Sequence, residues 1–304
     1  MKWLLLRLEN HYCSNMQRII PKGVLIPIGG NEDKGATLDE RETQDFIEEG
    51  ILAHVVKESG GIHASIIVIP TASSIPLEVG ENYLEAFGKI GCTHVRVLDI
   101  RSKQDCEKEE VIQMVSKTDC IMFSGGDQSK ITDRIAGTSV HRIILDRYHN
   151  EPGFVVAGTS AGAMAMSSYM IAGGSSTEAF VKGAVDMYRG LGLIPQLIID
   201  THFIQRGRFG RVAEAIAIHP ELIGVGLAED TGLIIRNGND VTVIGSGMVI
   251  IFDGQHIKHN KQGNLEEGTP MTLTNVIVHI LSNSDRFDIA KRKVHVLPID
   301  ASFI

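Results

Sequence analysis

The sequence has few cysteines and few aromatic residues. Its four cysteines, Cys13, Cys92, Cys106 and Cys120, are far apart and fit no metal-binding or redox spacing. They give no support to a disulfide framework or a zinc site, so we expect free thiols in a reducing compartment. Aromatic residues make up only 5% of the chain, whereas its 32 glycines suit many tight connections between strands and helices.

Long apolar runs are also missing from the amino-terminal region. The run Trp3 to Leu6 is followed at once by Arg7, so it is too short for a signal-peptide core or a membrane span. We therefore expect a cytoplasmic protein that does not enter a membrane. Residues 1–15 show no clear periodicity, and we expect them to form a disordered extension ahead of a single α/β domain over residues 16–304.

The chain lacks the charge and the motifs of a nucleic-acid or nucleotide protein. Its formal charge of -8 argues against a nucleic-acid backbone as the main ligand, because phosphate binding relies on basic patches. Two Gly-Gly loops, at 29–30 and 125–126, directly follow predicted strands, but neither has the spacing of a dinucleotide fingerprint or a P-loop lysine, so nucleotide binding has weak support. No convincing set of metal ligands is present either, and we expect no metal or other cofactor.

From Gly23 onward, short aliphatic runs alternate with amphipathic stretches, which is typical of a mostly parallel sheet flanked by helices. The predicted strands of this part are 24–28, 66–69, 95–100, 120–124 and 154–157. The predicted helices are 41–59, 78–90, 105–117 and 128–149, the last as one helix or two short ones. In the C-terminal third, strand-like runs and the turn pairs Asn237-Gly238 and Asp253-Gly254 predict antiparallel hairpins.

The sequence Gly158-Thr159-Ser160-Ala161-Gly162 follows a buried strand and precedes a predicted helix. This is the Gly-x-Ser-x-Gly pattern, in which a tight turn raises a serine hydroxyl into a cleft. The same pattern also suits a turn of small residues that packs a helix onto a sheet. The remaining residues at the strand ends decide between these two interpretations.

Open α/β sheets bind ligands beyond the carboxyl ends of their strands. The loops expected there contain Gly29-Gly30 after the first strand, Gly125-Gly126 after the fourth, and Ser160 after the fifth. We expect Gly125-Gly126 to bring backbone N–H groups beside Ser160. The N–H groups of Gly126 and Ala161 would then form an oxyanion hole.

A serine hydroxyl needs a base, and a histidine base needs a group that orients it. His202 and Glu229 are the best candidates because each follows an aliphatic strand-like run. An acidic residue after a strand is also common as a helix cap or turn residue, so spacing alone leaves both interpretations open.

Arg206, Arg208 and Arg211 lie close together in an acidic chain. They suit the exposed start of a helix. Guanidinium groups also bind carboxylates through two hydrogen bonds, so these arginines are candidates for recognising an acidic substrate.

Five motifs in the same order along the chain resemble those of the cyanophycinases, which form one serine-peptidase family with aspartyl dipeptidase (peptidase E). The resemblance extends over about residues 23–255. The motifs are Ile28-Gly29-Gly30-Asn31-Glu32-Asp33-Lys34, Gly125-Gly126-Asp127-Gln128, Gly158-Thr159-Ser160-Ala161-Gly162-Ala163, Asp200-Thr201-His202-Phe203-Ile204-Gln205-Arg206-Gly207-Arg208-Phe209-Gly210-Arg211 and Gly224-Val225-Gly226-Leu227-Ala228-Glu229-Asp230-Thr231.

This resemblance implies a flavodoxin-like fold related to class I glutamine amidotransferases, and a homodimer. It assigns Ser160 as nucleophile, His202 as base and Glu229 as the acid that orients the base. The implied substrate is cyanophycin, a polyaspartate chain with arginine on each β-carboxyl, which is cut to β-aspartyl-arginine dipeptides. The implied substrate pocket consists of Gln128, Asp200, Thr201, Arg206, Arg208 and Arg211.

Two residues depart from the pattern of the resembled family. Thr201 stands where glutamine is common, and Ala228 stands where an acid is common. The first difference removes a substrate contact, so two alternatives stay open: a related peptidase that acts on other aspartyl or β-aspartyl peptides, and a non-catalytic small-molecule-binding module on the same fold.

Overall fold

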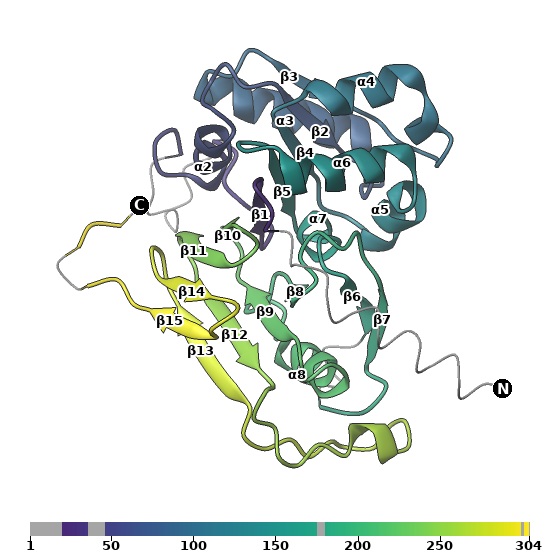
Figure 1. Cartoon of the computed structure of the whole chain (residues 1–304), viewed down its shortest axis with the longest axis vertical. Helices are drawn as coiled ribbons and strands as arrows, with labels where there is room; N and C mark the ends of the chain where they lie inside the picture. Colours follow the sequence, from purple (N-terminus) through teal and green to yellow (C-terminus); the bar gives the residue numbers. More distant parts are fainter. Residues whose placement is uncertain (1–19, 36–45, 175–179, 299–300, 304) are drawn as a thin grey trace.

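The computed structural model describes residues 20–35, 46–174, 180–298 and 301–303. The expected extension, residues 1–15, lies outside these ranges. The main feature is a nine-stranded sheet with the order β15-β14-β11-β10-β1-β5-β4-β2-β3. In Figure 1 the helices α2 to α6 surround one half of this sheet, and the strands of the C-terminal third form the other half of the molecule with α8.

Strands β1 to β5 form the parallel half of this sheet. They span Val24–Ile28 (β1), Ile66–Ile69 (β2), Val95–Val97 (β3), Cys120–Phe123 (β4) and Val155–Thr159 (β5). All five strands predicted from the sequence are present. The third is shorter than predicted and its side chains are only partly buried, as is common for a strand at the edge of a sheet.

Helices cover both faces of the parallel strands. They span Ile51–Glu58 (α2), Pro76–Ile90 (α3), Glu109–Lys117 (α4), Gln128–Ile135 (α5) and Ser139–Asn150 (α6), and a 3₁₀ turn, η1, spans Asp105–Glu107. Because successive side chains of a strand point to opposite faces, Ile26 and Ile28 of β1 pack with α2 and α3, whereas Leu25 packs with α5 and α6. This pattern explains why the buried strands read as continuous apolar runs.

The C-terminal half is built mainly from antiparallel strands. The remaining elements are α7 (Ala161–Met164), β6 (Tyr169–Gly174), β7 (Val185–Arg189), β8 (Leu197–Asp200), α8 (Phe209–Ile218), β9 (Ile223–Leu227), β10 (Thr231–Arg236), β11 (Asp240–Gly245), β12 (Val249–Asp253), η2 (Gln262–Asn264), β13 (Ile277–Leu281), β14 (Arg286–Asp288) and β15 (Lys293–His295). Strands β10, β11, β14 and β15 extend the large sheet, and β8, β9, β12 and β13 form a second one. Only β8 and β9 pair in parallel within the second sheet.

Three sequence predictions about local structure were wrong. The single helix predicted over 105–117 is divided into η1 and α4, because Lys108 between them has an extended backbone. The helix predicted over 41–59 begins only at Ile51, because Gly50 takes an extended conformation as its N-cap; residues 41–45 lie outside the described ranges. Asp253-Gly254 does not close a hairpin, since β12 pairs with β13, which begins at Ile277. The Asn237-Gly238 turn does connect the antiparallel pair β10 and β11, as predicted.

Three of the four predicted free thiols lie in the described residues. Cys92, Cys106 and Cys120 are free and buried, and Cys13 lies outside the described residues. Among the helices in the described ranges, none has the length and apolar character needed to cross a membrane.

The contact between α7 and β4 sets the position of the turn at Ser160, and it depends on glycine. A methyl group on Gly162 would lie 2.6 Å from the carbonyl oxygen of Phe123. We expect Gly162→Ala to lower the free energy of unfolding by about 1–3 kcal/mol, the usual cost of overpacking. Urea denaturation followed by circular dichroism measures this change.

Gly88→Ala provides the matched control. Gly88 lies in α3, and a methyl group there would meet nothing within 4 Å. Alanine in a helix interior is favoured over glycine by roughly 0.5–1 kcal/mol, so this variant should be slightly more stable than the wild type. Equal stability of the two variants would show that the spacing of α7 and β4 does not require Gly162.

Candidate active site

The candidate site lies where the ends of several strands meet. Strand β1 pairs in parallel with β5 on one side and antiparallel with β10 on the other. The end of β5, the loop after β1 and the residues just before β10 are therefore neighbours. Ser160 follows β5, His202 follows β8, and Glu229 lies between β9 and β10.

Ser160 occupies a strained turn between β5 and the single helical turn α7. Its backbone angles are φ 51° and ψ -109°, which are unfavourable for a residue with a side chain. The N–H of Ser160 donates to the carbonyl oxygen of Ile28 at 2.9 Å, so β1 holds the turn. Gly158 contacts Gly162 across the turn, where a methyl group would lie 2.7 Å from a backbone carbon. These features match the predicted serine elbow.

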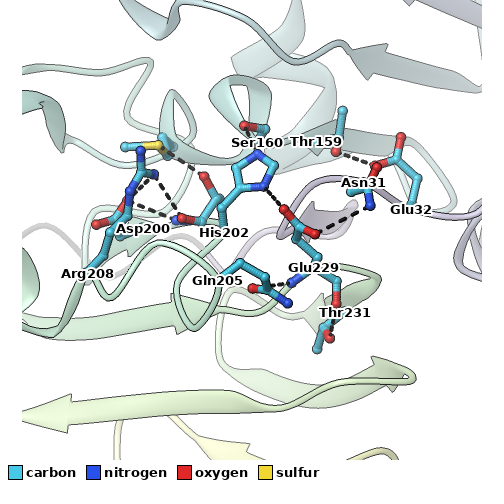
Figure 2. Close-up of polar contacts among 12 residues, drawn as sticks. Asn31, Glu32, Thr159, Ser160, Asp200, His202, Gln205, Arg208, Glu229 and Thr231 are labelled. Atoms are coloured by element: carbon cyan, nitrogen blue, oxygen red, sulfur yellow. Dashed lines mark hydrogen bonds and ion pairs between the residues drawn. The ribbon is translucent and has the colours of Figure 1, made fainter. Parts of the chain in front are cut away.

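Ser160, His202 and Glu229 form a continuous chain of contacts (Figure 2). The Oγ of Ser160 lies 2.9 Å from Nε2 of His202, and Nδ1 of His202 lies 2.6 Å from Oε1 of Glu229. When the carboxylate of Glu229 accepts a hydrogen bond from the N–H at Nδ1, Nε2 is free to accept a hydrogen bond from the serine hydroxyl. These distances are the ones that a serine nucleophile, a histidine base and an orienting acid would require.

The electrostatic environment favours neutral His202. Burial lowers the pKa of the imidazole, the hydrogen bond to Glu229 raises it, and the positive charge of Arg206 lowers it again, with a net decrease from the ordinary value. A lower pKa leaves more of the imidazole unprotonated at neutral pH, as a general base requires.

The sequence placed Gly29 and Gly30 in a loop at a strand end but gave them no contact with the candidate base, against which this loop packs. A methyl group on Gly30 would lie 2.4 Å from Cε1 of His202, and one on Gly29 would lie 1.8 Å from the carbonyl oxygen of Ala228. The N–H of His202 also donates to the carbonyl oxygen of Gly29 at 2.9 Å. This loop therefore fixes the position of the imidazole.

Sequence reasoning also missed polar residues around Glu229. The Nδ2 of Asn31 donates to Oε2 of Glu229 at 3.4 Å, and the Oε1 of Gln205 accepts from the Glu229 N–H at 3.3 Å (Figure 2). Asp230, next in the chain, points elsewhere, because its carboxylate accepts from the hydroxyl of Ser246 at 2.5 Å. Both Asn31 and Gln205 are in the motifs quoted above, but no local pattern indicated their contacts.

A cavity of about 360 Å³ opens beside Ser160. It is lined by Gly126, Asp127, Gln128, Ser129, Ser160, Met164, Ala172, Arg206, Arg208 and Arg211. The three arginines predicted from the sequence therefore do reach one cavity together with the serine. Within the described ranges, no group of three or more His, Cys, Asp or Glu side chains is arranged to hold a metal ion, at this cavity or at any other place.

Asp200 holds two of these arginines. Its Oδ1 lies 3.1 Å from Nη1 of Arg208, and its Oδ2 lies 3.1 Å from Nε of Arg211. Asp200 is fully buried, and burial raises its pKa while Arg211 and Arg208 oppose that change by favouring the ionised form. Arg206 differs from the other two, because it is exposed.

Two predicted substrate-binding residues have their side chains engaged within the protein. Thr201 is fully buried, its hydroxyl donates to Sδ of Met164 at 3.4 Å, and it does not line the cavity. Gln128 does line the cavity, but its Nε2 donates to the carbonyl oxygens of Ile171 and Ala172 in β6. Gln128 therefore joins the cavity wall to the β6–β7 hairpin.

Both predicted oxyanion-hole residues lie in the described part of the chain. Ala161 follows Ser160 as the first residue of α7, and Gly126 lines the same cavity. Gly126 has φ 140°, and a methyl group on it would lie 2.2 Å from the carbonyl oxygen of Ala72. The adjacent Gly125 approaches Ser160, since a methyl group there would lie 3.4 Å from the serine Cβ.

Comparison with known proteins identifies the family. Residues 37–244 match the model of peptidase family S51. The chain is 37% identical over 273 residues to a cyanophycinase of Trichormus variabilis, covering 90% of this chain and 88% of that protein. It is also 37% identical over 281 residues to a cyanophycinase of Geminocystis herdmanii, covering 92% and 97% of the two chains. A crystal structure of a peptidase from an acI-B1 Actinobacterium aligns with a TM-score of 0.58 at 21% identity, covering 86% of this chain and 98% of that one, which supports the mixed α/β fold. The chain therefore belongs to peptidase family S51 and is a serine-type peptidase.

Proposed function

We propose that this peptidase is an exopeptidase that hydrolyses cyanophycin to β-aspartyl-arginine dipeptides through Ser160, His202 and Glu229. The observation that carries the proposal is the chain of contacts from Ser160 Oγ to His202 Nε2 and from His202 Nδ1 to Glu229 Oε1, beside a cavity lined with arginines. The similarity to two cyanophycinases supports the choice of substrate.

In the proposed reaction, Ser160 attacks the scissile carbonyl carbon while His202 takes the hydroxyl proton. Glu229 stabilises the imidazolium that forms. His202 then gives the proton to the departing amine, and an acyl-enzyme on Ser160 remains. Water attacks the acyl-enzyme with His202 again as base, which releases the product acid and restores the serine.

Backbone N–H groups of Gly126 and Ala161 are proposed to stabilise the oxyanion of each tetrahedral intermediate. Support comes from the close approach of the Gly125-Gly126 turn to Ser160 and from the place of Ala161 at the start of α7. Donors fixed before the reaction need no reorganisation when the charge develops, so they favour the transition state.

Arg206, Arg208 and Arg211 are proposed to bind a free carboxylate of the substrate. Asp200 orients Arg208 and Arg211 and offsets part of their charge, while Arg206 stays exposed at the cavity. Gln128 shapes the wall next to them. Thr201 has no place among the proposed contacts, because its side chain is buried against Met164.

The finer assignments of the fold and assembly are proposals as well. We propose one peptidase domain over residues 16–304 with a flavodoxin-like arrangement related to class I glutamine amidotransferases. The parallel strands with helices on both faces support the arrangement, and one hydrophobic core that extends from Leu25 to Ile289 supports a single domain. A homodimer and a cytoplasmic location stay predictions.

Purified protein incubated with cyanophycin tests the proposed function. We expect mass spectrometry to detect β-aspartyl-arginine, and Ser160→Ala to lower the rate at least about a hundredfold with the fold unchanged by circular dichroism, since loss of a nucleophile usually costs several orders of magnitude. His202→Ala should lose a similar factor, and the double variant should be little worse than either one, because the two residues serve one step. Turnover of other aspartyl peptides but not of cyanophycin would replace the proposed substrate.

The pH dependence of kcat/KM tests the environment of His202. Activity needs the neutral imidazole, so the rate should rise with pH through a midpoint below the ordinary histidine value of about 6.5. Arg206→Ala removes a positive charge that lowers this pKa, so the midpoint should move to higher pH, and more so at low salt. Arg96→Ala, an exposed arginine on the distant edge strand β3, is the control. A midpoint that moves down, or equally in both variants, would contradict the assignment of His202 as base.

Lysine substitutions test how the arginines act on the substrate. Arg208→Lys keeps the charge but loses the planar group that can bridge Asp200 and a substrate carboxylate, so we expect KM to rise about tenfold or more with kcat little changed. Arg206→Lys should change KM by less than about threefold, because an exposed charge acts mainly by salt-screened attraction. An unchanged KM in Arg208→Lys would remove Arg208 from the proposed carboxylate site.

A further inference from the structure

A buried carboxylate lies behind the proposed nucleophile. Glu32, in the loop after β1, is only 4% exposed. Its Oε2 accepts from the hydroxyl of Thr159 at 2.5 Å, and its Oε1 accepts from the hydroxyl of Tyr83 at 2.5 Å. The Nζ of Lys34 lies 2.9 Å from the same Oε1. Figure 2 shows the contact between Glu32 and Thr159.

The surroundings of Glu32 favour its charged form. Burial by itself raises the pKa of the carboxyl group, but the charge of Lys34 and the hydrogen bonds from Thr159 and Tyr83 outweigh it, so the pKa lies below its ordinary value. Burial and the charge of Glu32 raise the pKa of Tyr83 well above its ordinary range, so Tyr83 remains a donor. Glu32 is therefore a fixed anion at neutral pH.

A buried ion pair seldom adds stability, because removing two charges from water is costly. The contacts of Glu32 indicate what this charge does in the structure. Thr159 is the last residue of β5, and Ser160 comes next with its strained positive φ. The N–H of Ser160 donates to Ile28 of β1, and the Thr159 hydroxyl donates to Glu32 in the loop after β1. Two hydrogen bonds from adjacent residues thus hold the elbow against one segment.

Glu32 has no direct part in the proton transfers. It does not line the cavity beside Ser160, so it does not reach the substrate there. Its two oxygens already accept from Thr159, Tyr83 and Lys34, and His202 is paired with Glu229 instead. These contacts allow Glu32 to influence Ser160 through its hydrogen bond with the neighbouring Thr159.

We propose that Glu32 is a positioning residue that, through its hydrogen bond with the Thr159 hydroxyl, directs the Ser160 hydroxyl toward His202. The neighbouring Asn31 holds the second oxygen of Glu229, so one loop positions both ends of the proposed triad. This inference rests on the proposed role of Ser160 as nucleophile.

The reactivity of Ser160 toward a fluorophosphonate probe tests the inference without a peptide substrate. Ser160 Oγ forms a bond to phosphorus, fluoride leaves, and His202 takes the hydroxyl proton. Thr159→Val keeps the shape of the side chain but removes the hydroxyl that donates to Glu32, and Glu32→Gln keeps the shape but removes the charge. We expect each to lower the second-order labelling rate about tenfold or more, and to lower kcat for peptide hydrolysis with KM little changed.

Thr159→Ser and Thr118→Val are the matched controls. Thr159→Ser keeps the hydroxyl, so its labelling rate should stay within about threefold of wild type. Thr118 is a buried threonine just before β4, at the opposite end of the parallel strands from Ser160, and its hydroxyl donates to the carbonyl oxygens of Ser65 and Cys120. Thr118→Val should lose stability without loss of labelling rate. Thermal unfolding measured on every variant separates the folded fraction from reactivity.

The outcomes separate this inference from the proposed function. Labelling that persists in Ser160→Ala, or a wild type that is not labelled, would overturn the assignment of Ser160 itself. Normal labelling of wild type, none in Ser160→Ala, and a Thr159→Val rate equal to that of Thr118→Val would overturn the role of Glu32 alone. Equal losses in Thr159→Val and Thr159→Ser would do the same, because the hydroxyl would then not be the cause. The threonine variants decide the question even if Glu32→Gln does not fold.

Discussion

The double pairing of β1 is the constraint on which the site depends. Because β1 pairs in parallel with β5 and antiparallel with β10, the carboxyl end of β5 and the start of β10 meet at one end of β1. Both hydrogen-bond ladders extend to Ile28, the last residue of β1. A slip of β1 by one residue on either side would point its buried residues to the wrong face and separate Ser160 from the segment that carries Glu229.

Charge is distributed in opposite ways on the two sides of Ser160. On the side of the proposed substrate, three arginines line a cavity together with Asp127, and the buried Asp200 holds two of them, so the arginines outnumber these carboxylates although the chain has a formal charge of -8. Behind Ser160, the anion of Glu32 is held by one ammonium group and two hydroxyl groups. Fixed charges at these places cost stability, which the large apolar core supplies.

The sequence predicted the parts of the site that depend on strand ends. Ser160, His202 and Glu229 each follow an apolar run, and the carboxyl ends of such strands gather at one edge of a sheet. Asn31 and Glu32 were not predicted, because their partners Glu229 and Thr159 lie 198 and 127 residues away and no local periodicity encodes such pairs. Thr201 was predicted to bind the substrate, but its side chain is buried against Met164. The reason is related, because packing and not sequence position sets the direction of a side chain one residue past a strand. The helix predicted over 41–59 also shows what local spacing cannot predict. The apolar spacing of a helix extends to both sides of Gly50, but the extended backbone of Gly50 makes the helix begin at Ile51.

The close packing of Gly30 against His202 has a consequence for motion during the reaction. The imidazole touches backbone on one face and is tied to Glu229 at Nδ1. The ring therefore has no vacant rotamer on the Gly30 side into which it can swing between acylation and deacylation. In the proposed reaction, the leaving amine and the incoming water would therefore have to reach Nε2 from the side of the ring away from Gly30.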